Sequence, residues 1–167
     1  MAFEKPTPVA VVVGSDSDME VMTTCVRQLE QFGIKPAVRI ISAHRTPDIA
    51  AEFAHNAAKN GIKVIIAAAG MAAHLAGSLA GRTTLPIIGV PLAAKGALDG
   101  IDALLSTVQM PPGVPVATVA IGKAGAKNAA ILATQILALS DEALAKKLAE
   151  FKEDQARKVI EKDASVQ

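Results

Sequence analysis

Five short apolar runs recur along the chain, and they lack the alternating polar residues of a half-exposed strand. The first run, residues 9–13, reads Val-Ala-Val-Val-Val, which is typical of a strand buried on both faces. Similar apolar runs predict further strands at residues 37–41, 64–68, 86–90 and 114–121.

Stretches with helical spacing separate these runs. In the first of them Met22, Val26, Leu29 and Phe32 share one face, and Gly33 follows as a stop signal. Predicted helices cover residues 18–32, 47–60, 72–80, 98–108 and 124–139. Strands that alternate with helices in this way indicate βαβ units, and therefore an α/β domain with a central parallel sheet. Ligands of such domains bind beyond the carboxyl ends of the strands.

The end of the chain has a different pattern. Residues 124–139 are apolar around most of the helix circumference, which is typical of a helix buried on most sides. Ser140 is then predicted as an N-cap, with acidic residues in the first turn. A thin apolar stripe continues to about residue 162, which predicts a helix of ~20 residues and ~30 Å. The stripe consists of Leu144, Leu148, Phe151 and Val159.

This stripe suits packing on its own domain or on a neighbouring subunit. Because one small sheet layer cannot cover the preceding helix, we expect a large homo-oligomer with the tail from Ser140 onward packed between subunits. The length of 167 residues fits a single domain, with a core at about 8–139 and a C-terminal helix at about 140–162.

Composition narrows the functional classes. The net charge is +1, and no basic stripe or acidic tail points to nucleic acid or to a basic partner. The only cysteine, Cys25, cannot form an internal disulfide, which is typical of a reducing compartment. Residues 1–6 contain no apolar signal segment, and no run has the length of a membrane span. We therefore expect a cytoplasmic protein.

The most informative polar cluster follows the second predicted strand. Ser42, His44 and Arg45 come directly after an apolar run, and Thr46 and Pro47 are suited to start the next helix. Arginine binds phosphate or carboxylate in bidentate fashion, and a nearby histidine is a candidate proton carrier. On these residues alone, a helix cap with a solvated arginine and an incidental histidine is an equally good interpretation.

A second polar turn, residues 14–18, follows the first strand and reads Gly-Ser-Asp-Ser-Asp. It is neither a dinucleotide fingerprint nor a P-loop, but its hydroxyls and helix N–H groups suit a single phosphate. Since carboxylates repel phosphate, Asp16 or Asp18 has another task, either contacting sugar hydroxyls or capping the helix.

A third segment, residues 67–77, consists almost entirely of small residues around His74. Such a bare backbone lets a ligand approach closely, although a lone histidine is more often a satisfied core residue. His55 lies in the middle of a predicted helix and is expected at the surface. Three scattered histidines without nearby acids make a poor metal site.

Taken together, these segments resemble the class I N5-carboxyaminoimidazole ribonucleotide mutase family of bacterial purine biosynthesis. The resemblance extends from Val9 to about Leu139 and rests on ordered blocks. The blocks are residues 14–18, 42–48, 72–75, 89–91, 109–111 and 114–124. It implies a flavodoxin-like three-layer α/β subunit, a homo-octamer, and a reaction without metal or organic cofactor.

The implied reaction moves a carboxylate from the exocyclic nitrogen of an aminoimidazole ribonucleotide to ring carbon 4, through released and recaptured carbon dioxide. By resemblance, His44 is the general acid and base, and Asp18 contacts the ribose hydroxyls. The phosphate is assigned to Ser15, Ser42 and Arg45, and the pocket for the base and the carbon dioxide to Gly70, Ala73, His74 and Leu75. The alternatives are a carboxylase that uses free carbon dioxide and a non-catalytic phosphosugar-binding module.

The chain departs from the family within residues 68–78. Related enzymes usually read Gly-Ala-Gly-Gly-Ala-Ala-His-Leu-Pro-Gly-Met, whereas this chain has Ala68, Met71, Ala76 and Ser78 at four of these positions. Met71 matters most because it places bulk in a loop that is normally bare. The retained residues 72–75 argue against the class II relatives, which take up carbon dioxide directly.

Overall fold

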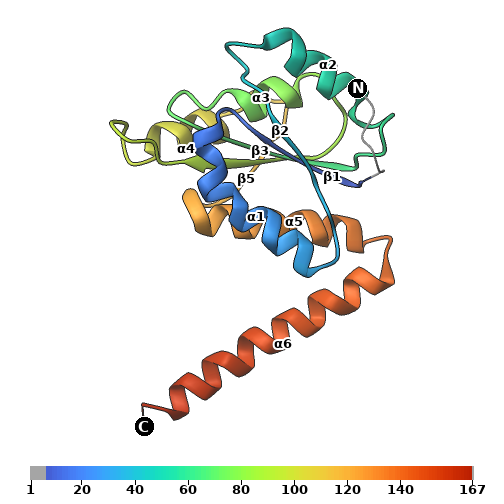
Figure 1. The fold of residues 1–167 in the computed structure, drawn as a ribbon, viewed down its shortest axis with the longest axis vertical. Coiled ribbons are helices and arrows are strands. Elements are labelled where there is room, and N and C mark those ends of the chain that lie inside the picture. The colour runs from blue at the N-terminus through green and yellow to red at the C-terminus, as the bar shows by residue number, and fades with distance from the viewer. Residues whose placement is uncertain (1–6, 167) are drawn as a thin grey trace.

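A five-stranded parallel sheet forms the centre of the chain in the computed structural model, which describes residues 7–166 (Figure 1). The strand order is β2-β1-β3-β4-β5, which is the flavodoxin-like order of a doubly wound fold. The α/β fold predicted from the sequence is therefore confirmed. The strands are β1 (Val9–Val13), β2 (Ala37–Ile40), β3 (Val64–Gly70), β4 (Ile87–Leu92) and β5 (Ala117–Thr118).

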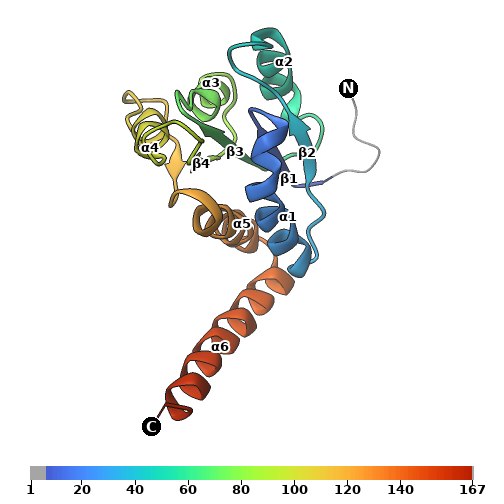
Figure 2. The same cartoon turned by 60° about the vertical axis from the view of Figure 1, so that its left-hand side comes forward.

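Helices cover both faces of this sheet (Figures 1 and 2). Helices α1 and α5 lie on one face, and α2 and α3 lie on the other. The elements are η1 (Asp16–Asp18), α1 (Met19–Gln31), α2 (Pro47–Ala57), α3 (Leu75–Ala80), α4 (Ile101–Val108), α5 (Gly122–Ala138) and α6 (Glu142–Ala164).

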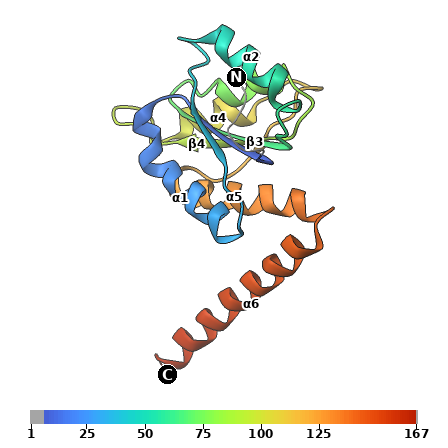
Figure 3. The same cartoon turned by 45° about the vertical axis from the view of Figure 1, so that its right-hand side comes forward.

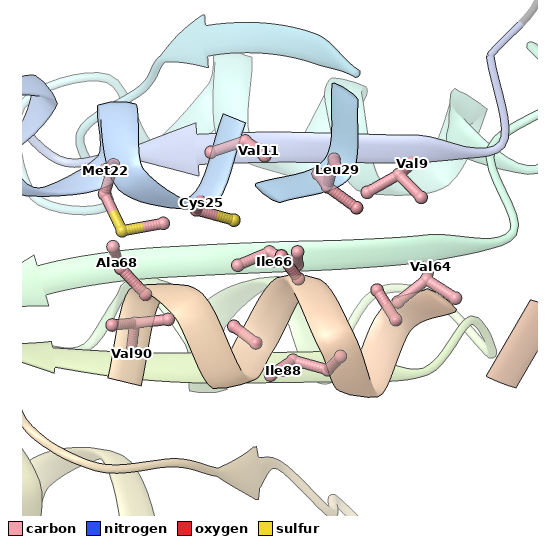
Figure 4. Packing of buried hydrophobic residues seen from close by; sticks show 14 of the residues in the cluster. Val9, Val11, Met22, Cys25, Leu29, Val64, Ile66, Ala68, Ile88 and Val90 are labelled. Carbon is pink, nitrogen blue, oxygen red and sulfur yellow. The ribbon is translucent and has the colours of Figure 1, made fainter. Parts of the chain in front are cut away.

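The first strand shows why an unbroken apolar run is needed at the centre of the sheet. Val9 and Val11 pack against α1 on one face, while Ala10 and Val12 belong to the core on the other (Figure 4). All five residues of β1 are fully buried. On α1, Cys25 packs against the same core, and burial raises the pKa of its thiol to about 12.

The predicted fifth strand was too long. Only Ala117 and Thr118 pair with β4, because the preceding segment is occupied by the turn in which the Val114 N–H donates to the Pro111 carbonyl. Conversely, β4 does not end at Pro91 but continues to Leu92. Since the pairing with β5 stops at Gly89, the missing N–H of Pro91 interrupts no ladder on that side.

Several helix ends also differ from the sequence interpretation. Helix α4 begins at Ile101 instead of 98, because Asp99 and Gly100 adopt left-handed φ values of 50° and 87°. Helix α2 ends at Ala57, three residues before the predicted end. The N-cap of α6 is Asp141, not Ser140, and its carboxylate accepts a 3.0 Å hydrogen bond from the Leu144 N–H.

Helix α6 runs away from the rest of the subunit (Figures 1 and 3). Its first turns are held by Phe151, whose ring meets that of Phe32 edge-on at 5.4 Å, and by Lys147, which donates to the Phe32 carbonyl. Its last turns are uncovered, and Val159 and Ile160 are each 67% exposed. Within residues 7–166, no helix is both long and apolar enough to cross a membrane.

One buried amide gives a stability prediction. The Gln28 side chain on α1 is 4% exposed, and its Nε2 has no hydrogen-bond partner among residues 7–166. A buried unpaired donor costs about 1–3 kcal/mol. Gln28→Met keeps the side-chain length without the donor, and we expect it to raise Tm by about 2–4 °C per kcal/mol recovered.

Thermal unfolding at matched protein concentration measures this effect. Gln31→Met, at an exposed position of the same helix, is the control and is expected to leave the free energy of unfolding within about 0.5 kcal/mol of the parent. A Gln28→Met protein less stable than the parent would mean that the amide is satisfied in solution.

Candidate active site

The three polar segments predicted from the sequence meet in one cleft of about 550 Å³. The cleft lies beyond the carboxyl ends of β1, β2 and β3. Here the strand order switches, because β2 is added on one side of β1 and β3 on the other. It is lined by Gly14, Ser15, Ser17, Asp18, Ser42, Ala43, His44, Arg45, Ala69, Gly70, Met71, Ala72, His74, Leu75 and Ala94. Of the predicted site residues only Ala73 is not in the lining, and it is 2% exposed.

The two cleft histidines form a direct pair. His44 Nε2 lies 2.8 Å from His74 Nδ1, and the rings meet nearly perpendicularly with centroids 4.9 Å apart. Because one of these two nitrogens must donate and the other accept, the protonation of one ring constrains the tautomer of the other. This contact positions His74 to orient the ring of His44, in addition to lining the pocket.

Arg45 joins the loops after β1 and β2. Its Nη2 donates to the Gly14 carbonyl at 3.2 Å, and its Nε donates to Ser42 Oγ at 3.3 Å. The backbone N–H of Arg45 donates to the same hydroxyl at 3.1 Å. A guanidinium carries five N–H donors, so these bonds hold the group in the cleft and leave donors for an anion.

Thr46 occupies the N-cap position of α2, as expected, but its hydroxyl does not cap the helix. Instead Thr46 Oγ1 donates to the Ser42 carbonyl at 2.9 Å and accepts from the Ser42 N–H at 3.1 Å. Thr46 therefore closes the turn that carries His44 and Arg45.

The carboxylates of the first loop are also engaged. Asp18 Oδ2 accepts from the Ser15 N–H at 3.0 Å, and partial burial raises the pKa of this carboxyl. The capping alternative left open by the sequence is thus observed, although Asp18 also faces the cleft. Asp16 accepts from the Ser15 hydroxyl and the Ser17 N–H, and the hydroxyl bond lowers its pKa.

Seven lining residues were not among the site residues predicted from the sequence: Gly14, Ser17, Ala43, Ala69, Met71, Ala72 and Ala94. Ser17 belongs to the same turn as Ser15, and its Oγ donates to Ser15 Oγ at 3.1 Å. Ala94 follows β4, and only the position of that strand beside β3 marks it as a neighbour of the site. His55 is exposed on α2, as expected, and residues 7–166 hold no group of three or more potential metal ligands.

Doubly wound α/β proteins bind small molecules at such strand ends, and a fixed arginine beside titratable rings suits a phosphorylated one. The fold and cleft thus define an α/β enzyme that acts on small phosphorylated molecules. The chain belongs to the AIR carboxylase family, whose model matches residues 8–158.

Curated relatives support this membership and confirm the resemblance drawn from the sequence. A Pyrococcus horikoshii protein is 54% identical over 97% of this chain and 89% of its own length. A Bacillus subtilis protein is also 54% identical, over 92% of this chain and 94% of its own. Both are named N5-carboxyaminoimidazole ribonucleotide mutase. The crystal structure of Treponema denticola PurE is similar with a TM-score of 0.85 and 32% identity, covering 95% of this chain and 98% of that one.

Proposed function

We propose that this chain moves a carboxylate from the exocyclic nitrogen of an aminoimidazole ribonucleotide to ring carbon 4, with His44 as general acid and base. The mutase role in purine biosynthesis agrees with the names of its relatives. The observation that carries the proposal is the pairing of His44 with His74 at 2.8 Å in the cleft that also holds Arg45.

The reaction needs a proton carrier that works in both directions. In the first half the nitrogen–carboxylate bond breaks, the nitrogen takes a proton from His44, and neutral carbon dioxide is released. In the second half ring carbon 4 bonds to the carbon dioxide and its proton returns to the imidazole. No proton is consumed overall, so one group serves both halves, and histidine is the side chain that ordinarily titrates near neutral pH.

The remaining residues bind and orient the ribonucleotide. Arg45 holds the phosphate, and Ser15 and Ser42 add neutral hydrogen bonds. Asp18 uses its carboxylate for the ribose hydroxyls while it keeps the Ser15 N–H in place. The base and the carbon dioxide lie against Gly70, His74 and Leu75. Ala73, which is buried and outside the lining, contributes only as part of the same loop.

Supplying each candidate substrate separately, after chelation of metals, tests this function. We expect the carbamate ribonucleotide to be converted at the same rate with and without chelator. Turnover only of the unmodified aminoimidazole ribonucleotide with bicarbonate would instead show a carboxylase. Binding of the ribonucleotide with turnover of neither substrate would show a phosphosugar-binding module.

We also propose that the protein works in the cytoplasm as a homo-oligomer, an octamer by resemblance to its family. Uncovered apolar side chains support assembly. On α4, Ile101, Leu105 and Val108 are 49%, 52% and 47% exposed and share one helix face. On α6, Val159 and Ile160 stand free of their own subunit.

Removing residues 156–167 is expected to lower the mass of the assembly without unfolding the subunit. The cut keeps Leu144, Leu148 and Phe151, which pack on the subunit's own core, and deletes Val159 and Ile160. Sedimentation velocity measures the mass, and circular dichroism checks the fold. Removal of residues 163–167 alone is the control. A shortened chain that sediments as an assembly of the original number of subunits would show that the tail is not an assembly element.

A further inference from the structure

Met71 combines an unusual backbone conformation with a place in the active site. It lies between β3 and α3, and its φ of 55° is in the left-handed region. Among residues 7–166, Asp99 is the only other non-glycine residue with positive φ, and it does not line the cleft. A bulky residue in this region is an outlier, and such strain gathers at functional sites.

The backbone conformation is required by the path of the loop. A Cβ on the preceding Gly70 would lie 3.1 Å from the Leu92 carbonyl oxygen and 3.2 Å from the Ala94 Cβ, so the chain passes tightly against the end of β4. It then turns within three residues to present His74 to His44. Glycine at position 71 would make this turn without strain, so the turn itself does not explain a methionine side chain.

The Met71 side chain is the large, exposed apolar side chain of the cleft lining. Four of the lining residues are alanines, which contribute only methyl groups: Ala43, Ala69, Ala72 and Ala94. Only Met71 and Leu75 carry large apolar side chains. Leu75 is 2% exposed and fixed in the core, whereas Met71 is 57% exposed. A thioether on three rotatable bonds adapts readily to a neighbouring shape.

We propose that Met71 folds over the occupied cleft and retains the carbon dioxide released between the two halves of the reaction. This inference rests on the function proposed above. Carbon dioxide is neutral, so neither Arg45 nor the histidines hold it by charge, and its retention depends on walls that exclude water. Met71 thereby sets the ratio of recapture at ring carbon 4 to escape, and it is a specificity-determining residue.

Isotope wash-in during turnover tests this role. The unlabelled carbamate ribonucleotide is converted in ¹³C-bicarbonate with carbonic anhydrase, and the labelled fraction of the product is measured at early conversion. We expect little label with the parent protein and a several-fold larger labelled fraction with Met71→Gly, which removes the cover. This fraction is a ratio, so partial unfolding of a variant does not change it.

Met71→Leu is the matched control because it keeps apolar bulk and the same backbone strain. It is expected to retain carbon dioxide nearly as well as the parent. Equal labelled fractions for the parent and Met71→Gly would overturn the inference and leave the proposed function standing. A parent that forms no product from the carbamate would overturn both.

Oxidation of Met71 provides a measurement that does not need turnover. Hydrogen peroxide transfers one oxygen to the thioether, giving the sulfoxide and water. We expect the bound 4-carboxy product to slow sulfoxide formation at Met71 several-fold, as measured by mass spectrometry. Met110, outside the cleft, is the internal reference. Equal oxidation of Met71 with and without product would show that it does not cover the ligand.

Discussion

Replacing His44 with asparagine is expected to lower kcat by at least ~10²–10⁴-fold, the usual contribution of general acid–base catalysis. Asparagine keeps much of the size and hydrogen bonding of histidine but cannot carry a proton in this range. In the proposed mechanism His44 acts in both halves of the reaction, so the loss in kcat is expected at or above the top of that range. Steady-state kinetics on the carbamate ribonucleotide measure it, and product binding by calorimetry shows that the cleft is intact.

His74→Asn is the matched variant. His74 meets His44 at 2.8 Å and acts by orienting it, so we expect a smaller fall in kcat together with a changed pH profile. An active His44→Asn protein beside an inactive His74→Asn protein would show that His74, and not His44, carries the proton.

Arg45→Ala is expected to weaken binding of the ribonucleotide roughly 10–150-fold, because a hydrogen bond to a charged group contributes about 1.5–3 kcal/mol. Ser42→Ala removes a neutral partner and is expected to cost less. Arg45→Lys is expected to rescue poorly, since lysine lacks the planar group that reaches Gly14 and Ser42 together. Calorimetry with the product and with inorganic phosphate measures these effects. Unchanged affinity in Arg45→Ala would show that the phosphate lies elsewhere.

Local sequence patterns were enough to predict the sheet and three of its loops. The unbroken apolar run of β1 and the abrupt change from apolar to polar residues after β2 are each visible within a few consecutive residues. They placed Ser42, His44 and Arg45 at a strand end, where the structure has them.

Features that depend on distant residues were not predictable in this way. His44 and His74 are 30 residues apart in the chain, and their contact follows from the adjacent positions of the loops after β2 and β3. The shortness of β5 follows from its limited pairing with β4. The left-handed turn at Met71 follows from the close approach of Gly70 to the end of β4. Each of these required the folded chain.

The hydrogen bonds of Arg45 connect binding of the substrate phosphate to the rate of the chemical step. The proposed proton carrier, His44, and the proposed phosphate ligand, Arg45, are consecutive residues, and the guanidinium is hydrogen-bonded to Gly14 in the loop after β1. A ligand phosphate that holds the Arg45 guanidinium in place therefore also restricts the backbone that carries the His44 imidazole. Binding energy from a remote, unreactive group is then expressed at the reacting atoms. A dephosphorylated nucleoside should accordingly react slowly even at saturation, and adding free phosphate should restore part of its rate.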